Sequence, residues 1–310
     1  MRFRRPLLVA SAATLVAILA GCGGGGGGGT VTADGSSTVG PYVTAAAEGF
    51  RDVQPDVNVT VGISGTGGGF ERFCRGETDL SNASRPIKDE EAALCEENGV
   101  EYVEFQVAND ALTLVVNPQN DWATCLTVDE LRAIWKPGSK IRSWNQVRDS
   151  FPDVPLKLFG AGTDSGTFDY FTDVIVGEEG ASRTDYSPSE DDNVTVQGVA
   201  GTKGGLGYFG FSYFEENQDT LAAVEVDGGD GCVAPSVATA QDGTYTPLAR
   251  PLFVYVKKES FARQNVEGFI KYVLDNETTI AAQAQFVPLN AEQLAEQKQK
   301  FEETLSEAGS

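Results

Sequence analysis

Hydrophobic and polar residues follow each other along the chain in short blocks that predict strands and helices in turn. Runs rich in β-branched and aromatic residues give strand candidates at 57–63, 78–83, 102–107, 112–116, 156–159, 206–211 and 252–256. Apolar residues at helical spacing give helix candidates at 71–76, 89–98, 128–135, 168–176 and 261–274. Strands and helices that alternate in this way are typical of α/β domains, so we expect sheets covered by helices.

Three loops rich in serine, threonine and glycine stand where predicted helices begin. They read DGSSTVGP from Asp34, GISGTGGGF from Gly62 and GAGTDSGTF from Gly160. Helix N-termini attract anions, hydroxyls and peptide N–H groups donate hydrogen bonds to them, and glycine lets the backbone come close. One such loop is a weak signal, but three from different elements predict an oxyanion held from several sides. The GTGGG segment lacks the G-K-[ST] ending of a P-loop, which argues against a nucleotide.

The N-terminus predicts export and lipid anchoring. Three arginines within the first five residues precede an apolar stretch at 6–19, which is typical of a signal peptide. The following L-A-G-C segment resembles the lipobox of bacterial lipoproteins, in which cleavage precedes the cysteine and the thiol carries the lipid. We therefore expect a signal peptide at 1–21, a lipidated Cys22, and a glycine tether over 22–29. An ordinary secretory signal is the alternative.

The charge of the chain limits its partners. It has 23 basic and 45 acidic residues, for a formal net charge of −22. Nucleic-acid binding needs a basic surface, so we exclude that class of function. The acidic surface does not exclude a small anion, because exposed charges are screened within about 8 Å at physiological salt whereas buried donors act at contact.

The chain contains no histidine, which excludes Ser-His-Asp and Cys-His catalytic systems and histidine-ligated metals. We expect no catalytic residue, no metal and no cofactor. The Asp-rich stretches 191–192 and 227–230 are interpreted as solvated turns, with weak calcium binding as the alternative. An exported enzyme that binds phosphoesters stays open as a second class of function.

Four cysteines remain once Cys22 is assigned to lipid. An even number in an exported chain predicts two disulfides, and four cysteines allow three pairings. We prefer Cys74–Cys95, which flanks one strand-and-loop unit, and Cys125–Cys232, which closes the middle of the chain on itself. Zinc is the alternative, although no two cysteines have C-x₂₋₄-C spacing.

The motifs together resemble the PstS family, the phosphate-binding lipoproteins of bacterial phosphate ABC importers. To the three loops they add DLSNASRPI from Asp79 and ANDALTLVVNP from Ala108, and the resemblance covers about 30–290. It implies an α/β, two-lobed periplasmic-binding-protein-like fold of type II with a ligand cleft between the lobes. On that template lobe one is 30–111 plus 248–310 and lobe two is 112–247. The chain would cross between the lobes near 110–115 and 247–254.

The resemblance also implies binding residues where the motifs match. These are Ser37 and Thr38 in the first loop, Ser64, Thr66 and Gly67 in the second, and Ser165, Gly166 and Thr167 in the third. The alternative for each hydroxyl is helix capping, which serine and threonine commonly provide.

The chain departs from the family pattern at two charged positions. Some members have an arginine shortly before the S-G-T triplet, where this chain has alanine and glycine, so we expect Arg85, after Ser84, to supply the cation. The alternative is an exposed Arg85 paired with Asp89 or Glu90. A carboxylate that accepts the proton of phosphate would exclude sulfate. Some members place it in the DLSNASRP region. Here the candidate is Asp110, with Asp34 and Asp164 as further candidates.

We therefore expect an extracytoplasmic, lipid-anchored solute-binding protein that captures inorganic phosphate. Its expected partners are the permease subunits of an ABC importer, the membrane only through the lipid, and no nucleic acid. We expect it to be a monomer that closes by a hinge motion when the anion binds. The alternative ligands are sulfate, molybdate and tungstate.

Overall fold

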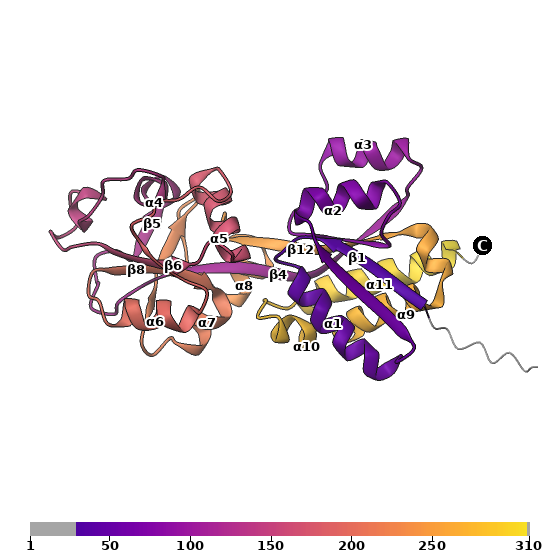
Figure 1. Ribbon diagram of the computed structural model, residues 1–310. Helices are drawn as coiled ribbons and strands as arrows, with labels where there is room; N and C mark the ends of the chain where they lie inside the picture. The colour runs from indigo at the N-terminus through magenta and orange to yellow at the C-terminus, as the bar shows by residue number, and fades with distance from the viewer. Residues whose placement is uncertain (1–28, 309–310) are drawn as a thin grey trace, which may run out of the picture.

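The computed structural model describes residues 29–308, which form two bodies connected by two long strands, β4 (Tyr102–Val116) and β12 (Ala249–Lys257) (Figure 1). One sheet runs through both bodies in the order β2-β1-β3-β12-β4-β8-β6-β7. The first half of β4 pairs with β12 and the second half with β8, so this strand belongs to both bodies.

The first body, which we call lobe one, has helices on both faces of its part of the sheet. Its other strands are β1 (Gly29–Gly35), β2 (Val57–Ile63) and β3 (Leu80–Ala83). Its helices are α1 (Gly40–Val53), α2 (Gly65–Cys74), α3 (Asp89–Glu97), α9 (Gln264–Asp275), α10 (Glu277–Gln283) and α11 (Ala291–Ala308). Alternate residues of β12 enter different cores: Leu252 and Val254 pack with α1 and α9, whereas Phe253 packs with α2. Both faces of the strand are therefore buried.

The second body, lobe two, repeats this arrangement around the other half of the sheet. Its strands are β6 (Lys157–Ala161), β7 (Ser187–Ser189), β8 (Gly205–Gly210) and β9 (Ala222–Ala223). Its helices are α4 (Val128–Trp135), α5 (Gly166–Phe171), α6 (Asp192–Ala200), α7 (Phe211–Glu216) and α8 (Val237–Gln241). Its main core extends from Leu112 to Leu248 and contains Trp135 and Trp144, both fully buried. The main hydrophobic cores of the two lobes are thus separate, and a small buried cluster of Ala111, Phe211, Ala240 and Val287 joins the lobes beside the crossing strands.

The crossing corrects one expectation. Residues 102–107 and 112–116 were predicted as two strands, but they form the single strand β4. The polar residues between them, Asn109 and Asp110, are buried and paired with β12 instead of forming a turn. The predicted strand 57–63 and helix 128–135 coincide with β2 and α4. The predicted helix 168–176 is α5 followed by a π-helical turn, Thr172–Val176.

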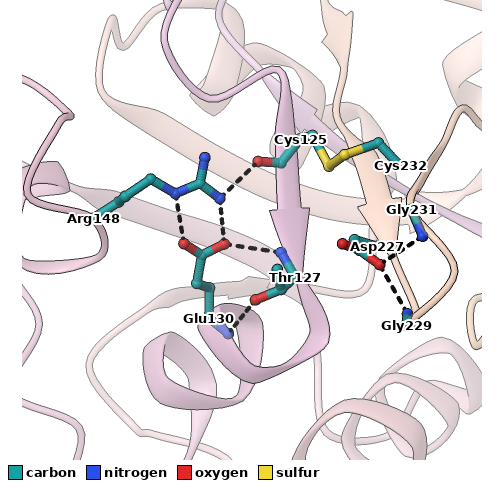
Figure 2. The surroundings of a disulfide bond; sticks show 8 residues. All are labelled: Cys125, Thr127, Glu130, Arg148, Asp227, Gly229, Gly231 and Cys232. Carbon is teal, nitrogen blue, oxygen red and sulfur yellow. Dashed lines mark hydrogen bonds and ion pairs between the residues drawn. A yellow bond between two sulfur atoms is a disulfide. The ribbon is translucent and has the colours of Figure 1, made fainter.

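Both expected disulfides are present. Cys74–Cys95 links α2 to α3 inside lobe one, and both cysteines are buried. Cys125–Cys232 joins β5 (Cys125–Thr127) to β11 (Cys232–Val233), the outer strands of a small sheet around β10 (Glu225–Asp227) (Figure 2). Each bond therefore lies within one lobe, and neither disulfide links the two lobes to each other.

The predicted signal peptide, Cys22 and most of the glycine tether lie outside the described residues. Gly29, which we assigned to the tether, is the first residue of β1. Over the described part of the chain, no helix combines the length and the apolar character that crossing a membrane requires.

Candidate functional site

A cleft of about 750 Å³ opens where the two lobes and the crossing strands meet. Lobe one lines it with the first loop, the second loop and the segment after β3; lobe two lines it with α5 and the turn that follows. The lining includes six predicted binding residues of lobe one and one of lobe two: Ser37, Thr38, Thr66, Gly67, Ser84, Arg85 and Gly166. Arg85 and Arg250 supply arginine side chains to this cleft.

The first loop joins β1 to α1 and lines the cleft. The backbone N–H of Ser36 donates to the carbonyl of Asn82 at 2.9 Å, which fixes the loop against β3. Ser37 is exposed, and Thr38 accepts a hydrogen bond from Arg250 at 3.0 Å. Within residues 29–308, α1 has no acidic residue in its first turn and no side-chain cap, so its N-terminus suits an anion.

The second loop enters α2, and its three predicted residues differ in role. Ser64 donates to Asp34 Oδ1 at 2.6 Å and lies outside the cleft, so its hydroxyl supports the loop. Thr66 contacts Ser84, with 3.1 Å between the two hydroxyl oxygens. A Cβ at Gly69 would lie 2.5 Å from the Gly35 Cα, so only glycine lets α2 come this close to β1. Asp34, a candidate proton acceptor, is buried and already engaged with Ser64 and Arg72.

The third loop, in lobe two, contacts the first loop of lobe one. A Cβ added to Gly166 would lie 3.1 Å from Thr38 Oγ1 and 3.6 Å from Ser37 Oγ. Ser165 accepts a hydrogen bond from the N–H of Thr167 at 3.1 Å, so this serine caps α5 as the alternative interpretation holds. Gly166 therefore lies in close contact with the first loop, and a larger residue there would require Thr38 to shift by a few tenths of an ångström.

A smaller cavity of about 170 Å³ lies next to this contact. It is lined by Ser165 and Thr167 and by two carboxylates, Asp110 and Asp192. Burial, together with the charges of Asp191 and Glu190, raises the pKa of Asp192 to about 6. Apart from Ser64, the predicted binding residues therefore fall into two groups, one for each cavity, and Ser37, Thr38 and Gly166 line both cavities. Asp164, the third candidate acceptor, is exposed and lines neither cavity.

Arg85 lines the cleft, but its guanidinium is already paired. Its Nη1 and Nη2 each donate to Glu91 at 2.8 Å, which is the bidentate geometry of a strong arginine–carboxylate pair. The partner is neither Asp89 nor Glu90, the two residues that the alternative interpretation named. Burial alone would raise the pKa of Glu91, but the hydrogen bonds from Arg85 and from the Lys88 backbone outweigh it and lower that pKa.

Arg250 is a cleft residue that the sequence analysis missed. It lies opposite Asp110 across the β4–β12 pairing, and its Nε and Nη2 each donate to Asp110 Oδ2 at 3.1 Å. Its guanidinium carbon lies 3.5 Å from the ring centroid of Tyr170. Burial raises the pKa of Asp110, and the charge of Arg250 partly opposes that shift. The only sequence signal was an arginine inside the predicted crossing segment 247–254.

One group of three potential metal ligands occurs in the described part of the chain: Cys125, Glu225 and Cys232. Its two sulfur atoms form a disulfide, so they cannot act as thiolate ligands (Figure 2). Of the two Asp-rich stretches, Asp227 accepts hydrogen bonds from the backbone of Gly229 and Gly231, and Asp191 caps α6. Both aspartates thus order turns of the backbone.

Comparison with known proteins identifies relatives along nearly the whole chain. A family profile described as "PBP superfamily domain" matches residues 21–277. The protein SphX of Synechococcus elongatus is 48% identical over 274 residues, which are 87% of this chain and 81% of that protein. The phosphate-binding protein PstS of Staphylococcus saprophyticus is 38% identical over 277 residues, or 89% of this chain and 85% of that one.

Solved structures agree with these relatives. The crystal structure of a possible phosphate binding protein from Planctomyces limnophilus has a TM-score of 0.86 and 46% identity, and the match covers 89% of this chain and 99% of that one. A putative phosphate ABC transporter substrate-binding protein with bound phosphate, from Clostridium perfringens, has a TM-score of 0.56 and 26% identity over 84% of this chain and 100% of that chain.

Proposed function

The chain belongs to the PstS family of phosphate-binding proteins within the PBP superfamily, and from this premise we propose that it captures inorganic phosphate outside the cell and delivers it to an ABC importer. In this proposal it is held at the membrane by a lipid on Cys22 and acts as a monomer. In the same proposal, lobe one consists of residues 30–111 and 248–310, and lobe two consists of residues 112–247.

The contact of Gly166 with the first loop is the observation that carries this proposal. It brings the third loop, from lobe two, against Ser37 and Thr38 of lobe one at the edge of the cleft. Polar groups of both lobes can therefore contact one tetrahedral anion at this position. An anion that binds both lobes at once favours the closed arrangement, because only that arrangement offers all the contacts.

The proposed binding set follows the family motifs. It consists of Ser37, Thr38, Ser64, Thr66, Gly67, Ser84, Arg85, Asp110, Ser165, Gly166 and Thr167. Within it Ser64 acts through its bond to Asp34, and the others line one of the two cavities. Arg85 and the helix N-termini provide positive potential, and Asp110 accepts the proton that phosphate carries at neutral pH. The binding step needs no cofactor.

Calorimetric titration of the ligand-free mature protein tests the proposed function. In the presence of a chelator, phosphate should bind with one-to-one stoichiometry and more tightly than sulfate. Tighter binding of sulfate or molybdate would reassign the ligand. Turnover of a chromogenic phosphoester would instead support the enzyme alternative.

A further inference from the structure

The Arg250 guanidinium connects three segments that belong to both lobes. Nη2 donates to Thr38 in the first loop of lobe one, while Nε and Nη2 donate to Asp110 on the crossing strand β4. On its other side the guanidinium stacks on Tyr170, which is in α5 of lobe two, four residues after Gly166. The Tyr170 hydroxyl also donates to the Pro247 carbonyl at 2.8 Å, at the start of the return crossing.

Arg250 keeps hydrogen-bond donors available for a ligand. Its side chain is 17% exposed and lines the cleft, and its Nη1 forms no hydrogen bond with any residue in 29–308. Both Nη atoms of Arg85, by contrast, are engaged with Glu91. A guanidinium fixed by a carboxylate and an aromatic ring loses little further entropy when an anion binds. Arg250 is therefore the better prepared of the two cations.

The bond to Thr38 affects the hydroxyl as well as the arginine. Because Thr38 Oγ1 accepts a hydrogen bond from Nη2 at 3.0 Å, the Thr38 hydroxyl proton is free to donate elsewhere. A charge-assisted bond to the oxygen also polarises the hydroxyl and makes it a stronger donor. The same hydroxyl faces Gly166 of lobe two. An anion at this position would meet Thr38, Arg250 and the third loop together.

We propose that Arg250 is a further anion-binding residue of the cleft and that it couples anion binding to the closure of the lobes. The inference rests on the proposed function, since it takes phosphate as the ligand. An anion bound to Nη1 and to Thr38 strengthens the arrangement in which Tyr170, and with it α5, stays against the crossing strands. The Arg250 side chain therefore both binds the anion and contacts the helix of lobe two whose position changes on closure.

The test compares Arg250→Ala and Arg250→Lys with a matched control, Arg148→Ala. Arg148 also forms a bidentate pair, with its Nε 2.8 Å and its Nη2 2.7 Å from the two oxygens of Glu130 (Figure 2). It also stacks on a ring, 4.7 Å from the centroid of Phe151, but it lies outside the cleft. Calorimetry measures the phosphate dissociation constant, small-angle scattering measures the change in radius of gyration on adding phosphate, and circular dichroism checks folding.

We expect Arg250→Ala to weaken phosphate binding by about 30-fold or more, since it removes one partner of a largely buried charge pair. Arg250→Lys should recover part of the affinity, because the charge remains and the planar fork is lost. Both variants should show a smaller change in radius of gyration at saturating phosphate. Arg148→Ala should bind within about twofold of the wild type, because sites far apart act independently.

Wild-type affinity and an unchanged scattering response in both Arg250 variants would overturn the inference. So would an equal loss in Arg148→Ala, which would point to general destabilisation. If Arg250→Ala fails to fold, a wild-type response in Arg250→Lys still refutes the coupling. A wild-type protein that binds no phosphate would refute the proposed function instead, so the two failures are distinguishable.

Discussion

Two arginine–carboxylate pairs lie at the cleft, and they differ in how far apart their partners are in the sequence. Arg85 and Glu91 are six residues apart in lobe one: Arg85 lies in the segment between β3 and α3, and Glu91 lies in the first turn of α3. Arg250 and Asp110 are 140 residues apart and meet only because β4 and β12 cross side by side between the lobes. The first pair orders one corner of lobe one. The Arg250–Asp110 pair lies on the two strands that cross between the lobes.

Burial raises the pKa of both carboxylates, but the net pKa shifts of the two groups have opposite directions. Glu91 is only partly buried, and its hydrogen bonds hold its pKa below the ordinary value. Asp110 is buried, and desolvation raises its pKa even though Arg250 opposes the shift. A charge kept in so unfavourable a place is weak evidence for stability, because an apolar pair of similar size would often be as stable. The Arg250–Asp110 pair is therefore better explained by function than by stability, whereas the Arg85–Glu91 pair also orders its own segment of lobe one.

The largest expected effect comes from removing both cations. If Arg85 and Arg250 each contribute independently about 30-fold, Arg85→Ala/Arg250→Ala should lose about 1,000-fold in phosphate affinity. The remaining hydroxyls and helix N-termini cannot neutralise a dianion in an acidic protein. Equilibrium dialysis with radiolabelled phosphate measures the constants of the single and double variants. A double variant no weaker than Arg250→Ala alone would show that Arg85 serves only Glu91.

Asp110→Asn tests the carboxylate of the Arg250–Asp110 pair, and its expected effect is smaller. The asparagine amide of this variant could donate as well as accept a hydrogen bond, so sulfate would be rejected less strongly. The ratio of phosphate to sulfate affinity should fall by about tenfold or more, the size of one hydrogen bond to a charged group. Calorimetric titration with both anions measures the ratio.

The control for this prediction is Asp169→Asn. Asp169 lines the cleft on α5, and burial raises its pKa too, against the charge of Arg250. It lies in the larger cavity, whereas Asp110 lies in the smaller one beside the S-G-T loop. A ratio that collapses in Asp169→Asn and stays constant in Asp110→Asn would transfer the role of proton acceptor to α5.

Local features of the fold and the site were predictable from the sequence. The glycine and hydroxyl patterns of the three loops depend on residues close in sequence, as do β2 and α4, so the chain itself displays them. The two disulfides followed from counting cysteines and from the spacing of each pair. In the same way, Arg85 stood out because it follows a short strand and ends a stretch of small residues.

Long-range features were not predictable in the same way. Arg250 lies near the start of a strand, where polar residues normally face solvent, and its partner Asp110 is visible only once β4 and β12 are paired. The break placed between 107 and 112 had the same cause, because buried polar residues at the crossing resemble a turn in the hydrophobic pattern. The helix α11 is mostly polar. It was missed because it packs through a few residues such as Phe301 and Gln297.

The smallest expected effect concerns the Arg85–Glu91 pair and depends on pH. Glu91→Gln removes the charge that pairs with Arg85, while Glu90→Gln removes a neighbouring charge of the same helix turn as a control. At pH 7 the Glu91→Gln variant should unfold about 1 to 3 °C below the wild type, because partly exposed pairs contribute up to about 1 kcal/mol. Thermal unfolding followed by circular dichroism from pH 3 to pH 7 measures the difference.

The direction of the pH dependence follows from the lowered pKa of Glu91. An acid whose pKa is lower in the folded state stabilises the fold above its unfolded pKa, and this contribution disappears as the pH falls through the folded value. The gap between Glu91→Gln and the wild type should therefore be constant near neutrality and close below about pH 4. A gap that persists at pH 3 would mean that Glu91 acts through packing. An equal gap in Glu90→Gln would mean that the helix dipole, and not Arg85, stabilises a negative charge in this turn. The Arg85–Glu91 pair would then have no specific role in ordering its side of the cleft.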